Sequence, residues 1–328
     1  MRAAYIEQLG PPEAIRCGEL PAPRPGPTDV LVDVSVTTVN HVDTFVRSGL
    51  FRTPTPFPFV IGRDAVGTVA EVGPGVSGFA VGDRVWCNSL GHGGRQGAAA
   101  ERAVVPAERL YHLPAGVGPV EAVATVHPAA TAYLALFVHC RLTPGETVVV
   151  TGAAGNVGSA LTVLAAQAGA RVVAVAAARD AQYCRRLGAA HALDYRDARL
   201  WDELSEKCPQ GAALYLDAAG VNNLEMAVDL LARRGRIVLL AGARSRPVLP
   251  VGALYMKDCQ VGGFVISHAA SADLAEAAAV INRLLATGRL RPRSTETLPL
   301  SAAAQAHRLV ESGKASGRRL VLHIGTQE

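Results

Sequence analysis

The sequence predicts an α/β protein of two domains, one built mainly from short strands and one from alternating strands and helices. Residues 1–120 alternate short apolar runs with glycine and proline, whereas residues 121–266 alternate alanine-rich helical patterns with β-branched strands. Strands separated by helices are typical of a parallel sheet covered on both faces, and short strands broken by turn residues are typical of a barrel. We therefore expect a doubly wound parallel sheet and a partly open β-barrel.

Composition and charge exclude several classes of protein. The 328 residues are 49% hydrophobic and 18% charged, which suits two domains with apolar cores. A net charge of +4, from 32 basic and 28 acidic residues, predicts no nucleic-acid surface. The apolar stretch 160–178 is broken by Gln167, Gly169 and Arg171, so it predicts a helix and a strand, not a membrane span. Six scattered cysteines and the lack of a secretory signal lead us to expect a cytoplasmic protein.

The barrel prediction comes from the first third of the chain. Apolar runs at 29–36, 65–72 and 82–86 have the length of strands, and proline–glycine turns at 25–27 and 73–75 separate them. No long helical pattern interrupts them, so we expect almost no helix in this region.

The clearest functional signal is a strand, a glycine-rich turn, a helix and a second strand in succession. A β-branched run at 147–151 precedes the turn, a helical pattern starts near Val157, and a second apolar run lies at 172–176. This βαβ order predicts a binding site for the pyrophosphate of a dinucleotide.

Each residue of the turn has a separate expected role. Gly155 lets backbone N–H groups approach phosphate oxygens, and Gly158 lets the helix pack closely on the strand. Ala153 stands where the G-x-G-x-x-G pattern has its first glycine, which weakens the motif. A tight turn that binds nothing is the alternative interpretation. The expected cofactor-binding residues here are Ala153, Gly155, Asn156, Val157 and Gly158.

The end of the second strand predicts which nicotinamide cofactor is used. NAD-binding proteins place an acidic residue there to bond the ribose 2′-hydroxyl, but this chain has small residues followed by Arg179. A guanidinium can bind a 2′-phosphate through charge-assisted hydrogen bonds, so we expect NADPH. Alternatively, Arg179 is a solvated residue that begins a helix, and Asp180 turns toward a ribose.

The remaining elements complete the domain assignment. Strands are expected at 192–195, 213–217, 236–241 and 260–266, helices near 273–286 and 301–312, and a last strand at 319–323. We expect this tail to return to the barrel. The predicted domains are therefore 1–120 with 267–328, and 121–266.

At this point the chain resembles a known family. The matching segments are 39–49, 58–67, 72–76, 81–85 and 129–133, with 187–189 and 319–322 extending the match to the C-terminus. They resemble the medium-chain dehydrogenase/reductase superfamily and, within it, the zinc-free NADPH:quinone oxidoreductases related to zeta-crystallin. The resemblance implies a Rossmann domain that binds NADPH and a GroES-like catalytic domain.

Two positions of this resemblance indicate whether the chain can bind a catalytic zinc ion. The zinc alcohol dehydrogenases of this fold carry a cysteine where this chain has Asn40 and a histidine where it has Arg63. A guanidinium cannot bind zinc, so we expect no metal ligand set. Without a Lewis acid, hydride transfer favours an acceptor that delocalises charge, such as a quinone or a conjugated carbonyl.

The resemblance also implies roles for single residues, each with a structural alternative. Asn40 is expected at the nicotinamide, donating to substrate or cofactor, or else it stabilises a turn. Asp43 enters the candidate catalytic pair with Asn40, although a helix-start role fits it better. The resemblance also implies cofactor contacts for Thr131, Tyr195 and Arg319. Gly242 follows the fifth strand and is expected to let the chain pass close to the cofactor, and Phe264 and Val265 are expected near the nicotinamide. Buried hydroxyl bonding for Thr131, edge packing for Tyr195 and core packing for Phe264 are the alternatives.

Two further observations limit the function. His41, His92 and His127 lie in unrelated segments without a spaced carboxylate, so we expect surface or core histidines rather than proton relays. Phe51 stands where many relatives and the enoyl thioester reductases carry a tyrosine, which removes a proton donor. A 2-alkenal or enoyl reductase is the first alternative function, and a non-catalytic crystallin-like or RNA-binding protein is the second. The resemblance implies a homodimer formed through the edge of the nucleotide-binding sheet.

Overall fold

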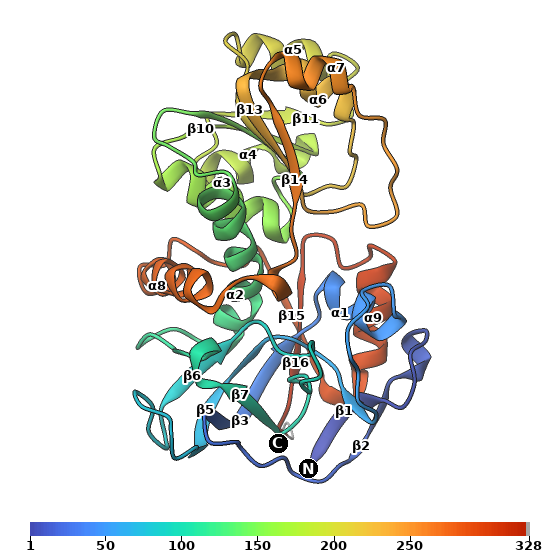
Figure 1. Cartoon of the computed structure of the whole chain (residues 1–328), viewed down its shortest axis with the longest axis vertical. Coiled ribbons are helices and arrows are strands. Elements are labelled where there is room, and N and C mark those ends of the chain that lie inside the picture. The colour runs from blue at the N-terminus through green and yellow to red at the C-terminus, as the bar shows by residue number, and fades with distance from the viewer. Residues whose placement is uncertain (326–328) are drawn as a thin grey trace. The chain divides into compact units, whose positions relative to one another are not determined.

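The computed structural model describes residues 1–325 of the chain, which divides into two compact units. The barrel unit comprises Met1–His127 and the chain from Ala269 onward, and the sheet unit comprises Pro128–His268. Figure 1 labels most of the elements named below.

The barrel unit is built from mainly antiparallel strands. These are β1 (Arg2–Ile6), β2 (Arg16–Glu19), β3 (Asp29–Thr38), β4 (Phe59–Val60), β5 (Ala65–Val72), β6 (Arg84–Cys87), β7 (Arg102–Pro106), β8 (Tyr111–His112), β15 (Thr295–Pro299) and β16 (Arg319–His323). A seven-stranded sheet runs β15-β16-β3-β5-β6-β8, with β7 also paired to β3, and a three-stranded sheet runs β2-β1-β4. The strands expected at 29–36 and 65–72 are present as β3 and β5.

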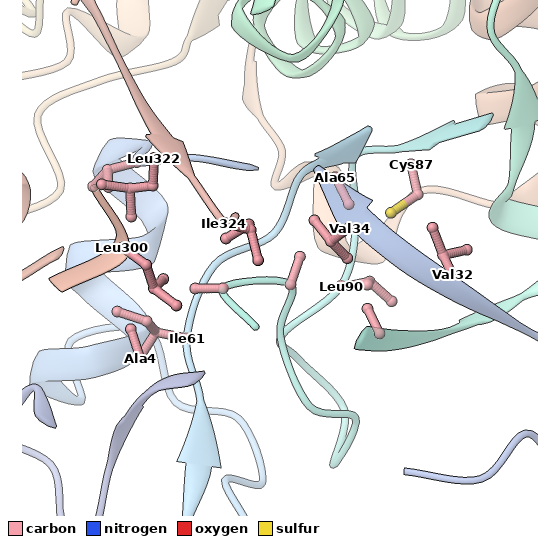
Figure 2. Close-up of a cluster of buried hydrophobic side chains, with 14 of the residues drawn as sticks. Ala4, Val32, Val34, Ile61, Ala65, Cys87, Leu90, Leu300, Leu322 and Ile324 are labelled. Carbon is pink, nitrogen blue, oxygen red and sulfur yellow. The ribbon is translucent and has the colours of Figure 1, made fainter. Parts of the chain in front are cut away.

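The chain's C-terminal segment completes the barrel unit. Strand β16 pairs antiparallel with β3, and Leu322 and Ile324 join the same buried cluster as Ala4 and Val34 (Figure 2). Four helices contribute to this unit: α1 (His41–Ser48), the first part of α2 (Pro119–Tyr133), α8 (Ser271–Ala286) and α9 (Ala303–Glu311). Before residue 119 the chain has one α-helix, α1, and two three-residue 3₁₀ helices, Pro12–Ala14 and Ala107–Arg109, in keeping with the expected scarcity of helix there.

The sheet unit contains one parallel sheet. Its strands are β9 (Thr147–Thr151), β10 (Arg171–Ala176), β11 (His191–Asp194), β12 (Ala212–Asp217), β13 (Leu231–Leu239) and β14 (Gln260–Gly263). Their order is β11-β10-β9-β12-β13-β14, and all neighbouring pairs are parallel. The predicted doubly wound fold is therefore confirmed. The chain reverses its direction of winding between β9 and β12, where such sheets bind ligands at the carboxyl ends of the strands.

Helices cover the sheet because successive strand residues point to opposite faces. Val149, Val173 and Ile237 pack with residues of α5 (Leu200–Lys207), α6 (Leu224–Leu230) and α7 (Val251–Met256). Helix α3 (Asn156–Gln167) contacts β9 and β10, and α4 (Ala181–Arg186) contacts β10 and β11. Figure 1 shows α5, α6 and α7 grouped together, apart from α3 and α4.

Two strand boundaries differ from the sequence prediction by more than two residues. Strand β13 begins at Leu231, five positions before the expected start, because its first residues pair with β12 across a register shift despite the polar pair Arg233-Arg234. Strand β14 ends at Gly263 rather than residue 266, and a short 3₁₀ helix, Ile266–His268, follows it.

One helical stretch among residues 1–325 has the length and apolar character of a membrane span. It covers Pro119–His139, and 72% of its most apolar window is buried inside the structure. Core helices of soluble proteins have the same properties, so this stretch is weak evidence for a membrane span.

Candidate nucleotide-binding and catalytic sites

The glycine turn after β9 has the conformation that a phosphate-binding loop needs. Gly152 takes a left-handed conformation with φ of +67°, which glycine adopts without a steric penalty. Ala153 is completely buried, and its N–H donates to the Val175 carbonyl at 3.1 Å. The alanine is tolerated in the motif because Gly152, not Ala153, carries the unusual backbone angle.

The start of helix α3 fits an anionic ligand. A Cβ atom at Gly158 would overlap the carbonyl oxygen of Gly152, so only glycine lets the helix pack this closely. Gly155 caps the helix, and Gly155 and Asn156 are exposed while Val157 is half-buried. The first N–H groups of a helix have no partner within it and carry partial positive charge. This cradle therefore fits the pyrophosphate of a dinucleotide.

A buried carboxylate organises the loop beside this turn. Asp217 ends β12 with no exposed surface, and its Oδ1 accepts from Thr151 Oγ1 at 2.9 Å and from the N–H groups of Ala219 and Gly220 at 2.8 Å. Its Oδ2 accepts from the Asn222 N–H at 2.6 Å. Four donors thus fix the chain where the winding of the sheet changes direction, between β9 and β12. The sequence showed Asp217 only as the end of a strand.

Gly242 is required by the same loop. Asn222 has a positive φ of 51°, and its Nδ2 donates to Ser245 Oγ at 2.7 Å and to the Ala241 carbonyl at 3.3 Å. Gly242 has a φ of +86°, and a Cβ there would overlap the Asn222 amide. The predicted approach of Gly242 to the cofactor stays a prediction, but its need for glycine has this local cause.

Two arginines and a tyrosine lie at the carboxyl ends of β10 and β11. Arg179 is exposed in the short 3₁₀ helix Ala178–Asp180 that follows β10. Tyr195 is 52% exposed, and its N–H donates to the Ala176 carbonyl at 3.0 Å. The guanidinium of Arg196, which sequence reasoning missed, lies 5.2 Å from the centre of the Tyr195 ring. Because β10 and β11 are neighbouring parallel strands, the two arginines that follow them lie at the carboxyl ends of the sheet strands.

Three further predicted cofactor contacts also lie in the sheet unit. Thr131, in α2, is half-buried. Phe264 and Val265 follow β14 and are half-buried, and the Phe264 ring stacks on that of His139 with centroids 4.2 Å apart. Phe264 is therefore not a fully buried core residue. Contacts of these three residues with a cofactor stay predictions.

In the barrel unit, strand ends bring together a group of polar side chains that we call the buried polar cluster. It consists of Thr38, Asn40, Asp43, Arg63, Asp64, His127 and Arg319, all buried. Thr38 ends β3, Asp64 precedes β5 and Arg319 begins β16. These three strands lie side by side in one sheet, which explains why residues so distant in sequence meet.

Asp64 is at the centre of this cluster. Its Oδ2 accepts from Thr38 Oγ1 at 2.6 Å and from Asn40 Nδ2 at 2.8 Å, and its Oδ1 lies 2.9 Å from His127 Nδ1. Burial opposes ionisation of Asp64, but His127, Arg319 and Thr38 together hold its pKa below the ordinary value. His127 was expected to be a surface or core histidine, and it is buried. Its carboxylate partner was not visible in the sequence, because the two residues are 63 positions apart.

The side chain of Asn40 forms hydrogen bonds with three residues of the cluster. Its Nδ2 donates to both Asp64 and Asp43, at 2.8 and 3.2 Å, and its Oδ1 accepts from Arg319 Nη2 at 2.9 Å. Both amide hydrogens are therefore engaged within the cluster, and the unused capacity of Asn40 is a lone pair on Oδ1. Donation to a substrate or cofactor stays a prediction.

Asp43 differs from Asp64 in its protonation. Its Oδ2 accepts from the Asn40 N–H at 2.7 Å, the helix-start role expected from the sequence. Burial, with a smaller contribution from the nearby Asp64 carboxylate, raises the pKa of Asp43 from 3.8 to about 6. The positive charge of Arg63 opposes this rise. The two carboxyl groups of the cluster therefore titrate in different pH ranges.

Arg319 binds inside the cluster, although the resemblance implied that it reaches toward a cofactor. Its Nε donates to the Ala124 carbonyl at 2.9 Å, and its Nη2 donates to Thr38 Oγ1 at 3.2 Å as well as to Asn40. The guanidinium is thus occupied by groups of the barrel unit. A contact with cofactor stays a prediction.

The cluster does not fit a zinc ion. Asn40 and Arg63 supply an amide and a guanidinium where zinc enzymes of this fold have ligands, and the acceptor atoms of Asp64 are engaged in hydrogen bonds. Within residues 1–325, no group of three or more His, Cys, Asp or Glu side chains is arranged to hold a metal ion.

Comparisons with known proteins agree with this architecture. The alcohol dehydrogenase GroES-like domain matches residues 26–115, and the zinc-binding dehydrogenase domain matches residues 156–283. A quinone oxidoreductase of Mus musculus is 28% identical over 327 residues, covering 98% of this chain and 97% of its own.

Two solved structures are similar over almost their whole length. An NAD-dependent alcohol dehydrogenase is 31% identical, with a TM-score of 0.89, covering 99% of this chain and 100% of its own. The Escherichia coli quinone oxidoreductase complexed with NADPH is 26% identical, with a TM-score of 0.84, covering 98% of this chain and 100% of its own.

Fold, sites and comparisons together define the class of protein. The chain belongs to the medium-chain dehydrogenase/reductase superfamily, whose members join a GroES-like domain to a Rossmann-type domain. Within that superfamily it belongs to the quinone oxidoreductase family. The family resemblance inferred from the sequence is confirmed.

Proposed function

We propose that this oxidoreductase transfers hydride from NADPH to a quinone or another conjugated carbonyl acceptor and uses no metal ion. The observation that carries the proposal is the buried polar cluster, in which Asn40 and Arg63 replace metal ligands and hydrogen bonds occupy Asp64. With no Lewis acid, the acceptor itself must delocalise the charge it gains, as quinones and enones do.

The chain's own residues then have the following roles. The first N–H groups of α3 bind the cofactor pyrophosphate, and Asp217 keeps the adjacent loop fixed. Arg179 and Arg196 bind the 2′-phosphate, with Tyr195 between the strand end and Arg196. Bound NADPH supplies the hydride from C4 of its nicotinamide. The barrel unit is the catalytic domain and the sheet unit is the nucleotide-binding domain.

The cofactor preference is tested by binding. NADPH and NADH are titrated against protein fluorescence for the wild type, Arg179→Ala, Arg196→Ala and the control Arg186→Ala, an exposed arginine of α4. Losing a charge-assisted hydrogen bond should weaken NADPH binding by about ten- to a hundredfold, with NADH and the control unchanged. Equal affinities for both nucleotides in every variant would refute NADPH preference.

The acceptor is tested by steady-state kinetics. We expect turnover with quinones and conjugated enones, and none with saturated ketones. Enoyl thioester reduction is disfavoured because Phe51 provides no phenol. If thioesters are the best acceptors, the alternative reductase function is correct, and if no acceptor reacts, the protein is a nucleotide-binding protein without turnover. One zinc ion per subunit that is lost together with activity on chelation would contradict metal independence.

We also propose a homodimer formed through the β14 edge of the sheet unit. Strand β14 pairs with β13 on one side only among the described strands, and an edge strand is a site for pairing between chains. Val251, Tyr255 and Met256 of α7 are 59%, 63% and 75% exposed, an unusual exposure for apolar side chains. Tyr255→Asp with Met256→Asp should convert a dimer to a monomer in analytical ultracentrifugation, and a wild-type monomer would refute the proposal.

Because all six cysteines are free and five are buried, a reducing compartment suits the chain, and we propose the cytoplasm.

A further inference from the structure

The guanidinium of Arg63 is an exception among the buried arginines of the barrel unit. Arg319 donates hydrogen bonds to Ala124, Thr38 and Asn40, and Arg47 pairs with Glu311 through Nη2, although its Nε and Nη1 have no partner within residues 1–325. Arg63 has no exposed surface, yet its Nε, Nη1 and Nη2 make no hydrogen bond with any residue of 1–325. Its nearest carboxylate oxygen, Oδ1 of Asp43, is 3.9 Å from Nε, beyond hydrogen-bond distance.

A buried donor without an acceptor destabilises a fold, so such groups in native proteins usually have a ligand or a function. A guanidinium has five N–H donors and no acceptor, and its planar fork suits an anionic oxygen. The carboxylates of the cluster do not meet this need, because Asp64 is bonded to Thr38, Asn40 and His127. The unused donors of the cluster are therefore those of Arg63.

The surroundings of Arg63 point to a planar ligand. The Phe51 ring lies with its centre 5.8 Å from the Arg63 guanidinium carbon and is half-buried. Phe51 belongs to residues 49–58, which contain no helix or strand and connect α1 to β4. A planar conjugated molecule that takes the place of the Phe51 ring would stack on the guanidinium as Phe51 does.

We propose that Arg63 binds the carbonyl oxygen of the acceptor and stabilises the oxyanion that forms during reduction, in the place of a metal ion. This inference rests on the proposed function. The acceptor gains a hydride on carbon, its π electron pair moves onto the carbonyl oxygen, the nicotinamide is oxidised by two electrons, and the oxyanion then takes a proton from water. Preorganised donors at such an oxygen are among the largest catalytic contributions in enzymes.

The first test measures binding and needs neither cofactor nor turnover. The probe is 4-nitrophenol, whose phenolate resembles the oxyanion of a reduced quinone and absorbs at a different wavelength from the phenol. We expect the wild type to lower the pKa of bound 4-nitrophenol by about one unit or more, which is a tenfold preference for the phenolate. Asp43, whose pKa is about 6, is only half ionised at pH 6, so the phenolate fraction is read at pH 7 and above, where Asp43 is largely ionised.

Variants separate Arg63 from its neighbours in this assay. Arg63→Met should abolish the shift, Arg63→Lys should retain part of it, and Phe51→Ala should tighten phenolate binding because the guanidinium is uncovered. The control is Arg109→Met, which removes another arginine of the barrel unit, bonded to Ser89 and the Ala269 carbonyl. An unchanged shift in folded Arg63→Met, with folding checked by thermal unfolding and by NADPH affinity, would overturn the proposal.

The second test uses turnover. Arg63→Met should lower kcat by about a hundred- to a thousandfold with little change in KM or in NADPH affinity. Added guanidinium ion should restore part of the activity of Arg63→Ala, an effect that a purely structural role would not produce. If the wild type reduces no acceptor, the proposed function fails. If the wild type is active and Arg63→Met, Arg63→Lys and Arg63→Ala all lose less than threefold, only this inference fails.

Discussion

Two buried carboxylates organise the two units, and they do so in different ways. Asp217 of the sheet unit accepts three backbone N–H groups from the five residues that follow it, and one hydroxyl. Asp64 of the barrel unit is bonded only through side chains, from Thr38, Asn40 and His127. The backbone network fixes a loop, whereas the side-chain network gathers titratable groups. We infer that binding depends on the first and chemistry on the second.

The largest expected effect comes from removing the loop anchor. Asp217→Ala leaves three N–H groups and the Thr151 hydroxyl without an acceptor, and we expect a loss of about 3–5 kcal/mol in the free energy of unfolding. Urea denaturation measures it, with the exposed Asp229→Ala as control. A loss no larger than that of the control would show that the loop is held by other contacts.

The next effect is the pH dependence contributed by Asp43. Its pKa is about 6 in the folded protein against an ordinary 3.8, so the folded state binds more protons between these values, and the contribution of Asp43 to stability falls as pH rises from 4 to 6. The full difference is about 3 kcal/mol. Asp64, whose pKa is lowered, loses its contribution only on acidification below its ordinary value.

A second buried group, His307, changes the stability in the opposite direction to Asp43 over the same pH interval. Burial lowers the pKa of His307 from 6.5 to about 3, so its contribution is present above pH 6.5 and is lost as the pH falls toward 3. The effect of Asp43 is therefore measured as a difference, by comparing unfolding of the wild type and Asp43→Asn across this range. The difference between the two proteins should change by about 3 kcal/mol between pH 4 and 7, and parallel curves would contradict the assignment.

The smallest expected effects come from a matched pair of substitutions. Thr151→Val removes one of four donors to Asp217, and Thr38→Val removes the corresponding hydroxyl donor to Asp64. Each should cost about 1–2 kcal/mol of stability. Thr151→Val should leave the kcat pH profile unchanged, whereas Thr38→Val should raise the pKa of Asp64, because the hydrogen bond of Thr38 lowers it. A wild-type profile in both variants would remove the proposed distinction between the two networks.

The sequence predicted features that depend on neighbouring residues. The strand after the glycine turn and the last strand were placed where β10 and β16 lie, because short uninterrupted apolar runs are typical of buried strands. Gly158 was predicted to allow close helix packing, and its position beside Gly152 agrees. The start of β13 was missed because its arginine pair resembles a loop, although tertiary pairing with β12 keeps it in the sheet.

The polar cluster could not be found in the same way. Asn40 contacts Asp64 across 24 positions and Arg319 across 279, and no spacing rule connects such residues. In the sequence, Arg63 indicated only that a metal ligand is missing at its position. That its buried donors have no partner follows from the three-dimensional arrangement of the surrounding atoms. No sequence motif identified Arg196 as a candidate, because its position over the Tyr195 ring depends on the direction of its side chain.

The pairing of β16 with β3 sets an order for assembly on the ribosome. The sheet unit is one continuous stretch, Pro128–His268, and all its strands precede Arg319 in the chain. The barrel unit needs Arg319 beside Asn40, so its polar cluster cannot form until Arg319 has been made. The nascent protein is therefore able to fold the sheet unit while the barrel unit is still open.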